Sequence, residues 1–284
     1  MPNMTEEQVI TPGLLRSWPL PDPQGNKEAR GTVLVVGGSR FTPGAVLLAG
    51  VAALRAGAGR LQLAVDQSTA AALSIAVPEA KVIGLPEKGA EVPAELLDMA
   101  AQVDVLAVGP GLDDIEETGR LLSALLDVAG KDSGVVLDAY ALGALSKDPA
   151  LLEGRSQRVV LTPNGTEAAH LLGDDPGDDL AAAARSLAER YPAVISLRSH
   201  IAAPDGRRWR EESGHSGLGT SGSGDVLAGI IAGLLGRGAE AAQAACWGAY
   251  THAVSGQRLI PRFGRTGFLA RELVDEVAAT IATV

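Results

Sequence analysis

The sequence of 284 residues contains a single cysteine, Cys246, so no disulfide bond can form within the chain. It therefore gives no sign of an oxidising compartment. Cys246 lies in an alanine-rich stretch with a helical pattern, where we expect a packed thiol rather than a nucleophile. The first ten residues lack the basic start and the apolar run of a signal peptide, so the sequence predicts a cytoplasmic protein.

Positive charge and long apolar runs are also scarce. The formal net charge is −10, and the short basic cluster Arg207, Arg208 and Arg210 is typical of a solvated turn. Proteins that bind nucleic acid normally carry a basic face, so we expect no nucleic acid as a partner. Apolar stretches such as residues 44–59, interrupted by Arg55, are too short to cross a bilayer, and we expect no membrane partner either.

Aromatic residues make up only 3% of the chain, although 46% of it is apolar. A core must therefore consist mainly of Ala, Val, Leu and Ile, which suits buried parallel strands packed under small-faced helices. The 35 glycines indicate many tight turns between strands and helices. The length allows one large domain or two modest ones.

Short apolar runs alternate with helical patterns along most of the chain, which predicts an α/β fold with a mostly parallel central sheet covered on both faces. We predict an N-terminal arm over residues 1–30, which is polar and rich in proline, and a single catalytic domain over residues 31–284. The predicted strands are 32–36, 61–65, 81–85, 103–108, 135–137, 158–162 and 193–197, with a hairpin at 200–209. The predicted helices are 45–56, 115–128, a short one ending at 172, 225–235, 239–259 and 267–282.

Several predicted strands end in residues that suit ligand binding. They are followed by Gly37-Gly38-Ser39, Gly109-Pro110-Gly111, Asp138 and Thr162-Pro163-Asn164. In open α/β sheets, ligands bind beyond the carboxyl ends of the strands. Each segment alone could be an ordinary turn, but four on one edge predict a site there.

The segment from residue 217 to 225 carries the clearest chemical signal. Glycines at 217, 219, 222 and 224 leave main-chain N–H groups bare, and a helix-forming run begins directly afterwards at Val226. The first turn of a helix has unpaired N–H donors and partial positive charge, so this segment predicts a cradle for a phosphate or an oxyanion. Asp225 at its end is a candidate catalytic base; the alternative is that Asp225 only caps the helix.

Two related motifs do not fit this segment. Gly217, Gly219 and Gly222 spell the dinucleotide fingerprint, but that motif should follow a strand early in the chain, whereas polar residues precede this one late in the chain. A P-loop would need a lysine, and none lies here. We therefore expect backbone amides, together with a divalent metal, to neutralise a bound phosphate.

The order of these motifs resembles a known family. The chain is similar to the ATP- or ADP-dependent NAD(P)H-hydrate dehydratases, which have a ribokinase-like fold. The segments that carry the similarity are 31–39, 44–45, 52–59, 109–112, 137–139, 161–163 with Glu167, 171–173 and above all 222–229. The resemblance runs in order from about residue 10 to the C-terminus. It implies a three-layer α/β/α domain and a hydro-lyase that repairs hydrated NADH or NADPH.

The resemblance also implies a mechanism and a set of site residues. Asp225 would deprotonate the ring hydroxyl for attack on the terminal phosphoryl group of ATP or ADP, with Mg²⁺, and elimination of phosphate would restore the cofactor. The implied contacts to the hydrated cofactor are Ala45, Gly111, Asn164 and Asp225. The implied contacts to the nucleotide are Arg198, Ser199, His200, Ile201, Ala202, Gly222, Ser223 and Gly224.

The chain departs from the family pattern at Tyr140, Asn164, Arg198-Ser199-His200 and His215, where the family usually has Asp, His, Lys-Gly-Ala and Asn. These positions bear on the choice of nucleotide and substrate. A kinase of the same fold acting on a thiazole or pyrimidine alcohol, and a catalytically weakened paralogue that only binds nucleotide, remain alternatives. We do not interpret His200 and His215 as a metal site, and the alanine-rich helices leave homo-oligomerisation open.

Overall fold

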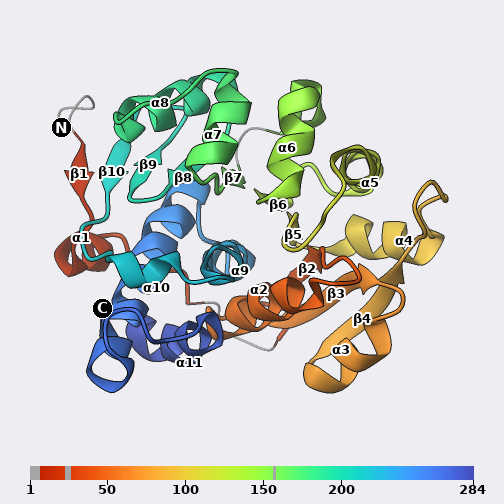
Figure 1. Cartoon of the computed structure of the whole chain (residues 1–284), viewed down its shortest axis with the longest axis horizontal. Helices are drawn as coiled ribbons and strands as arrows, with labels where there is room; N and C mark the ends of the chain where they lie inside the picture. The colour runs from red at the N-terminus through yellow and green to blue at the C-terminus, as the bar shows by residue number, and fades with distance from the viewer. Residues whose placement is uncertain (1–6, 23–26, 156–157) are drawn as a thin grey trace.

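The computed structural model describes residues 7–22, 27–155 and 158–284 (Figure 1). Their strands form one ten-stranded sheet in the order β1-β10-β9-β8-β7-β6-β5-β2-β3-β4. The strands are β1 (Gln8–Val9), β2 (Thr32–Val36), β3 (Arg60–Asp66), β4 (Ala80–Leu85), β5 (Val105–Val108), β6 (Gly134–Leu137), β7 (Val159–Leu161), β8 (Val194–Leu197), β9 (His200–Ala202) and β10 (Arg208–Arg210).

Helices cover both faces of this sheet. One hydrophobic core lies under α2, α9, α10 and α11, and a second lies under α4 to α8. The α-helices are α1 (Pro12–Ser17), α2 (Pro43–Arg55), α3 (Ala70–Ala76), α4 (Ala94–Gln102), α5 (Ile115–Val128), α6 (Tyr140–Lys147), α7 (Gly165–Leu172), α8 (Leu180–Arg190), α9 (Ser223–Gly236), α10 (Ala241–Phe263) and α11 (Ala270–Ile281). Two 3₁₀ turns, η1 (Pro149–Leu152) and η2 (Ser216–Gly219), complete the described elements.

In the part of the sheet that runs β8-β7-β6-β5-β2-β3-β4, every adjacent pair of strands is parallel. Strand β9 is antiparallel to both β8 and β10, and β1 is parallel to β10. This confirms the predicted α/β fold with a mostly parallel sheet, and also the hairpin at 200–209. The buried strands contain mainly Val, Leu and Ile, as expected for a sheet with both faces covered. The prediction missed the helices α1, α3, α4, α6 and α8. Three of them, α1, α3 and α6, have only six to eight residues, too few for a periodic pattern to stand out, whereas α4 and α8, with nine and eleven residues, were simply overlooked.

The first described residues lie along β10 and α10. The Ile10 N–H donates to the carbonyl oxygen of Arg210 at 2.8 Å, and Trp247 Nε1 donates to the carbonyl oxygen of Trp18 at 2.9 Å. Parts of the predicted arm, residues 1–6 and 23–26, lie outside the described residues. The domain boundary at residue 30 stays a prediction. Within the described part of the chain, no helix has both the length and the apolarity to span a membrane.

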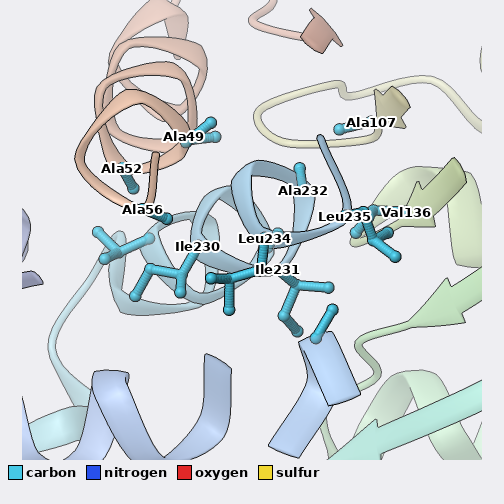
Figure 2. Close-up of a cluster of buried hydrophobic side chains, with 14 of the residues drawn as sticks. Ala49, Ala52, Ala56, Ala107, Val136, Ile230, Ile231, Ala232, Leu234 and Leu235 are labelled. Atoms are coloured by element: carbon cyan, nitrogen blue, oxygen red, sulfur yellow. The ribbon is translucent and has the colours of Figure 1, made fainter. Parts of the chain in front are cut away.

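Helices α2 and α9 pack closely because small residues face each other (Figure 2). A methyl group built onto Gly229 would overlap the carbonyl oxygen of Ala49, and one on Gly233 would overlap that of Ala53. Both contacts advance by four residues in the same direction, so the two helices run parallel. Their N-terminal ends therefore lie at the same edge of the sheet, where β2 and its parallel neighbours end.

We predict that Gly229→Ala lowers the free energy of unfolding by about 1–3 kcal/mol, because the added methyl group must push the two helices apart. Chemical denaturation with urea measures this change. Gly119→Ala is the matched control, since its methyl group would lie an ordinary 3.7 Å from Ala144 Cβ, and alanine is the better helix former by about 1 kcal/mol. Equal effects of the two substitutions would contradict the close-packing explanation.

Candidate active site

Four loops meet where the central parallel strands end, as the sequence predicts. The Gly38 N–H donates to the carbonyl oxygen of Pro110, and the Ser39 N–H to that of Gly111, both at 2.7 Å. Thr162 Oγ1 donates to Asp138 Oδ1 at 2.8 Å. The segments that follow β2, β5, β6 and β7 thus form one connected edge.

Ala45 and Gly111, two of the predicted substrate contacts, lie side by side on this edge. A Cβ built onto Gly111 would lie 2.8 Å from Ala45 Cβ and 2.5 Å from the carbonyl oxygen of Thr42. Gly111 also has a φ of 69°, which favours glycine. Both the backbone conformation and the lack of room for a Cβ atom therefore require glycine at position 111, with or without a ligand.

The glycine cradle has two kinds of glycine. Gly222 has a φ of 87° and ends the loop before α9, while Gly217 is packed against Phe268 and the main chain of Arg265. In contrast, a Cβ on Gly219 or Gly224 would meet no atom within 4 Å. The protein's own packing does not require glycine at these two positions, which leaves their backbone open to a ligand.

Asp225 is the third residue of α9, and Gly222 occupies the N-cap position. The alternative that Asp225 caps the helix is therefore wrong. Its carboxylate is partly buried and has no hydrogen bond or ion pair within the described residues. Burial raises the pKa of Asp225 to about 6.

Two further carboxyl groups, those of Asp138 and Glu167, have raised pKa values at this edge of the sheet. The pKa of Asp138 is raised to about 7, mainly by burial and also by the negative charges of Glu167 and Asp225, while the hydrogen bond from Thr162 opposes the shift. Burial also raises the pKa of Glu167. The sequence marks Asp138 only as a residue at a strand end and Glu167 only as part of a motif, because their shared burial depends on the fold.

Asn164 caps α7 together with Glu167. Asn164 Oδ1 accepts from the N–H groups of Thr166 and Glu167 at 2.9 and 3.0 Å, and Glu167 Oε2 accepts from the Asn164 N–H at 2.8 Å. The capping box uses the side-chain oxygen of Asn164 and leaves its amide NH₂ group able to donate to a ligand.

A cavity of about 690 Å³ opens between the cradle and the loops that follow β7 and β8. Its lining includes Asn164, Arg198, Ser199, Ser223 and Gly224 from the predicted site. The rest of its lining is Thr162, Pro163, Ser196, Glu211, Glu212, Gly214, His215, Ser216, Leu218, Gly219, Leu227, Ala249, His252 and Ala253. A groove of about 620 Å³ between α5 and α6 contains none of the predicted site residues.

Three of the predicted nucleotide contacts have side chains that point elsewhere. Ile201 and Ala202 lie in strand β9 and are buried in the two cores. His200 Nδ1 lies 3.0 Å from Glu7 Oε1, at the side of the sheet near β1. These three side chains do not line the cavity, because β9 turns back into the hairpin directly after Ser199.

The cavity also contains a histidine that no local motif marks. His252 Nε2 lies 2.7 Å from Ser223 Oγ in the first turn of α9. Burial lowers the pKa of His252 to about 4, so the ring is neutral near pH 7. This pair connects the cradle to α10.

Backbone strain in the described residues is concentrated at this edge. Ala139 and Arg198 are the non-glycine residues with positive φ there, at 47° and 53°. Ala139 separates the buried Asp138 from Tyr140, and Arg198 lines the cavity. Strained residues persist where the surrounding structure holds them, and they cluster at functional sites.

Comparisons with known proteins give a consistent picture. The model of the NAD(P)H-hydrate dehydratase family matches residues 33–279. An ADP-dependent (S)-NAD(P)H-hydrate dehydratase of Xanthomonas campestris is 46% identical, over 95% of this chain and 94% of its own length. A bifunctional NAD(P)H-hydrate repair enzyme of Moorella thermoacetica is 39% identical over 94% of this chain, which spans only 52% of that longer protein.

A similar solved structure covers nearly the whole chain. It is an ADP/ATP-dependent NAD(P)H-hydrate dehydratase of Bacillus subtilis, co-crystallised with ATP and Mg²⁺. It has a TM-score of 0.81 and 27% identity, covering 98% of this chain and 99% of its own.

We predict that the stability of the metal-free protein falls between pH 5 and pH 8, partly because Asp138 must ionise in a buried position. Its pKa is higher in the folded than in the unfolded state, so its favourable contribution is present at low pH and lost as the pH rises through about 7. Asp138→Asn should remove this contribution, which is at most about 3 kcal/mol between pH 5 and pH 8, because about two pKa units of the shift lie in that range. Urea unfolding at both pH values measures it, with the exposed Asp98→Asn as control; identical slopes in wild type and Asp138→Asn would contradict the prediction.

Proposed function

The chain belongs to the NAD(P)H-hydrate dehydratase family, and from this membership we propose how its residues carry out the nucleotide-dependent dehydration of hydrated NADH or NADPH. The enzyme is a hydro-lyase with a ribokinase-like fold. We propose ADP as its phosphoryl donor, because the Xanthomonas relative is named as ADP-dependent.

One observation carries the proposed chemistry: the carboxylate of Asp225 is partly buried, has no ion pair in the described residues, and follows a cradle of exposed glycine backbone. With a pKa of about 6, Asp225 is ionised at neutral pH but remains basic enough to accept a proton. It is therefore suited to take the proton of the ring hydroxyl as the hydroxyl oxygen attacks the terminal phosphoryl group. The bond between that phosphorus and its bridging oxygen breaks, and AMP leaves if ADP is the donor.

The second half of the reaction is an elimination. The bond between the ring carbon and the phosphorylated oxygen breaks, and phosphate leaves with the bonding electrons. The neighbouring ring carbon loses a proton, which restores the dihydropyridine. Phosphate is a much better leaving group than hydroxide, which is why phosphorylation comes first.

We assign the nucleotide to the 690 Å³ cavity. The uncrowded glycines Gly219, at the end of η2, and Gly224, in the first turn of α9, allow a phosphate to approach the main chain. Among the described residues that line the cavity, Arg198 is the one lysine or arginine, whereas Glu211 and Glu212 are acidic. A polyphosphate therefore needs positive charge beyond the side chains that are present.

Mg²⁺ fits this requirement. The carboxyl group of Asp138 is buried and that of Glu167 is partly buried, both with raised pKa values, so a cation near them would offset their desolvation. No group of three or more candidate ligand side chains lies among the described residues. Mg²⁺ does not need one, because it commonly uses one or two carboxylates, water and substrate phosphates. When bound, it would neutralise charge on the transferring phosphoryl group.

We assign the hydrated cofactor to the region next to Ala45 and Gly111, which, like Asp225, lie outside the lining of the 690 Å³ cavity. The absence of large side chains at these two positions leaves their backbone accessible. Asn164, at the boundary between this region and the nucleotide cavity, has a free amide NH₂ group to donate to the substrate.

We predict that the purified enzyme, given hydrated NADH or NADPH with Mg²⁺ and ADP or ATP, restores the near-ultraviolet absorbance of the reduced nicotinamide and releases phosphate. Measuring both products separates the alternatives. A small-molecule kinase of the same fold would transfer phosphate to another alcohol without elimination, and a weakened paralogue would bind nucleotide without turnover. Either result would refute the dehydratase assignment.

Asp225→Asn should lower kcat by at least about a hundredfold, since loss of a general base typically reduces the rate by 10²–10⁴. Because Asp225 must be ionised, kcat/KM of the wild type should fall as the pH drops below about 6. Steady-state assays from pH 5 to 8 measure both effects.

The exposed Asp98→Asn serves as a control for the charge change and should retain wild-type turnover. A thermal melt of Asp225→Asn shows whether the fold is preserved. A well-folded variant with near-normal activity would exclude Asp225 as the base.

A further inference from the structure

The chain's three tryptophans, three tyrosines and three phenylalanines all lie in the described residues, and their exposure is very uneven. Only Phe41, at 84%, and Tyr140, at 39%, are exposed to solvent. The other aromatic side chains are buried or partly buried. Exposed aromatic rings forgo a large burial energy, so their location is informative.

Both exposed rings belong to the same edge of the sheet. Phe41 lies in the loop after β2, and Tyr140 is the first residue of α6, two residues after Asp138. In the sheet, β5 lies between β2 and β6, and the loop after β5 carries Gly111. The two rings therefore come from the segments that follow β2 and β6, on either side of a proposed substrate contact.

The loop that carries Phe41 is firmly held. Thr42 Oγ1 donates to the carbonyl oxygen of Gly111 at 2.7 Å, and the Ser39 N–H donates to the same oxygen at 2.7 Å. Ser39 Oγ and Thr42 Oγ1 lie 2.7 Å apart. Phe41 is thus exposed to solvent even though hydrogen bonds hold its loop in place.

A positive charge lies next to this ring. The Arg40 guanidinium carbon is 5.6 Å from the centre of the Phe41 ring, and Arg40 forms no ion pair within the described residues. An aromatic ring beside an unpaired arginine suits a ligand with a planar base next to phosphate groups.

We propose that Phe41 and Tyr140 form an aromatic platform on which the adenine of NAD(P)H hydrate stacks, with Arg40 near the substrate's phosphates. The proposal rests on the proposed function. The hydrated ring must reach Asp225, so the adenylate half has to extend from the Ala45–Gly111 region towards the surface. Stacking on aromatic rings suits any planar base and would bind this half without affecting the reacting atoms.

The test compares two substrates that differ only in the adenylate half: NADH hydrate and the hydrate of reduced nicotinamide mononucleotide. Phe41→Ala and Tyr140→Ala should each raise KM for NADH hydrate roughly tenfold, the effect of about 1.4 kcal/mol of lost stacking, with kcat within about twofold. KM for the mononucleotide hydrate should change by less than about twofold. Tyr140→Phe keeps the ring and should restore the low KM.

Ile75→Ala is the matched control, because Ile75 is 82% exposed near the C-terminal end of α3, away from this edge. It should leave KM for both substrates at the wild-type value. Binding of the product NADH, followed by its own fluorescence, gives a second readout that does not depend on turnover. Phe41→Ala should weaken it about tenfold relative to wild type.

Other outcomes would overturn the platform. An equal rise in KM for both substrates would mean that the rings contact the nicotinamide half or only support the loop. A rise in KM for ADP alone would assign them to the co-substrate. A wild-type enzyme inactive on both substrates would instead refute the proposed function, and unchanged NADH binding in Phe41→Ala would then refute the platform separately.

Discussion

The close contact between α2 and α9 determines where the chemistry can occur. The carbonyl groups of Ala49 and Ala53 lie against Gly229 and Gly233 with no side chain between them. Because the two helices run parallel, this contact brings their N-terminal turns to one edge of the sheet. The turn of α2 carries Ala45, and the turn of α9 carries Asp225. The proposed base and the proposed substrate region next to it are therefore positioned by rigid helices, which hold them more accurately than loops would.

The electrostatics of the site follow from burial. Desolvation raises the pKa values of Asp138, Glu167 and Asp225, and the first two carboxyl groups repel each other. Among the described residues that line the proposed nucleotide cavity, Arg198 is the one arginine or lysine. The site of the free protein thus has excess negative charge, and Mg²⁺ bound together with the nucleotide, as proposed, would supply the missing positive charge. Such a site favours binding the metal and the phosphate groups together over binding either alone.

The sequence was sufficient to predict most of the fold, because buried strands of Val, Leu and Ile alternate with long helical patterns. The glycine cradle and the four strand ends were also predictable, since local spacing alone defines them. The N-cap alternative for Asp225 failed because a left-handed glycine, Gly222, starts the helix earlier than the apolar run suggests. The contact between Ser223 and His252, and the inward turn of Ile201 and Ala202, depend on how distant elements pack, which no local pattern encodes.

The left-handed backbone of Arg198 has an evolutionary consequence. A residue with a side chain in this conformation typically costs on the order of 1 kcal/mol, and glycine would relieve that strain. Glycine would also remove a guanidinium that lies beside the start of α7, where its Nη2 would be 3.9 Å from a Cβ at position 165. Low backbone strain and a positively charged side chain therefore cannot both be optimal at this position. A homologue with glycine here would need to place its cationic group on another element.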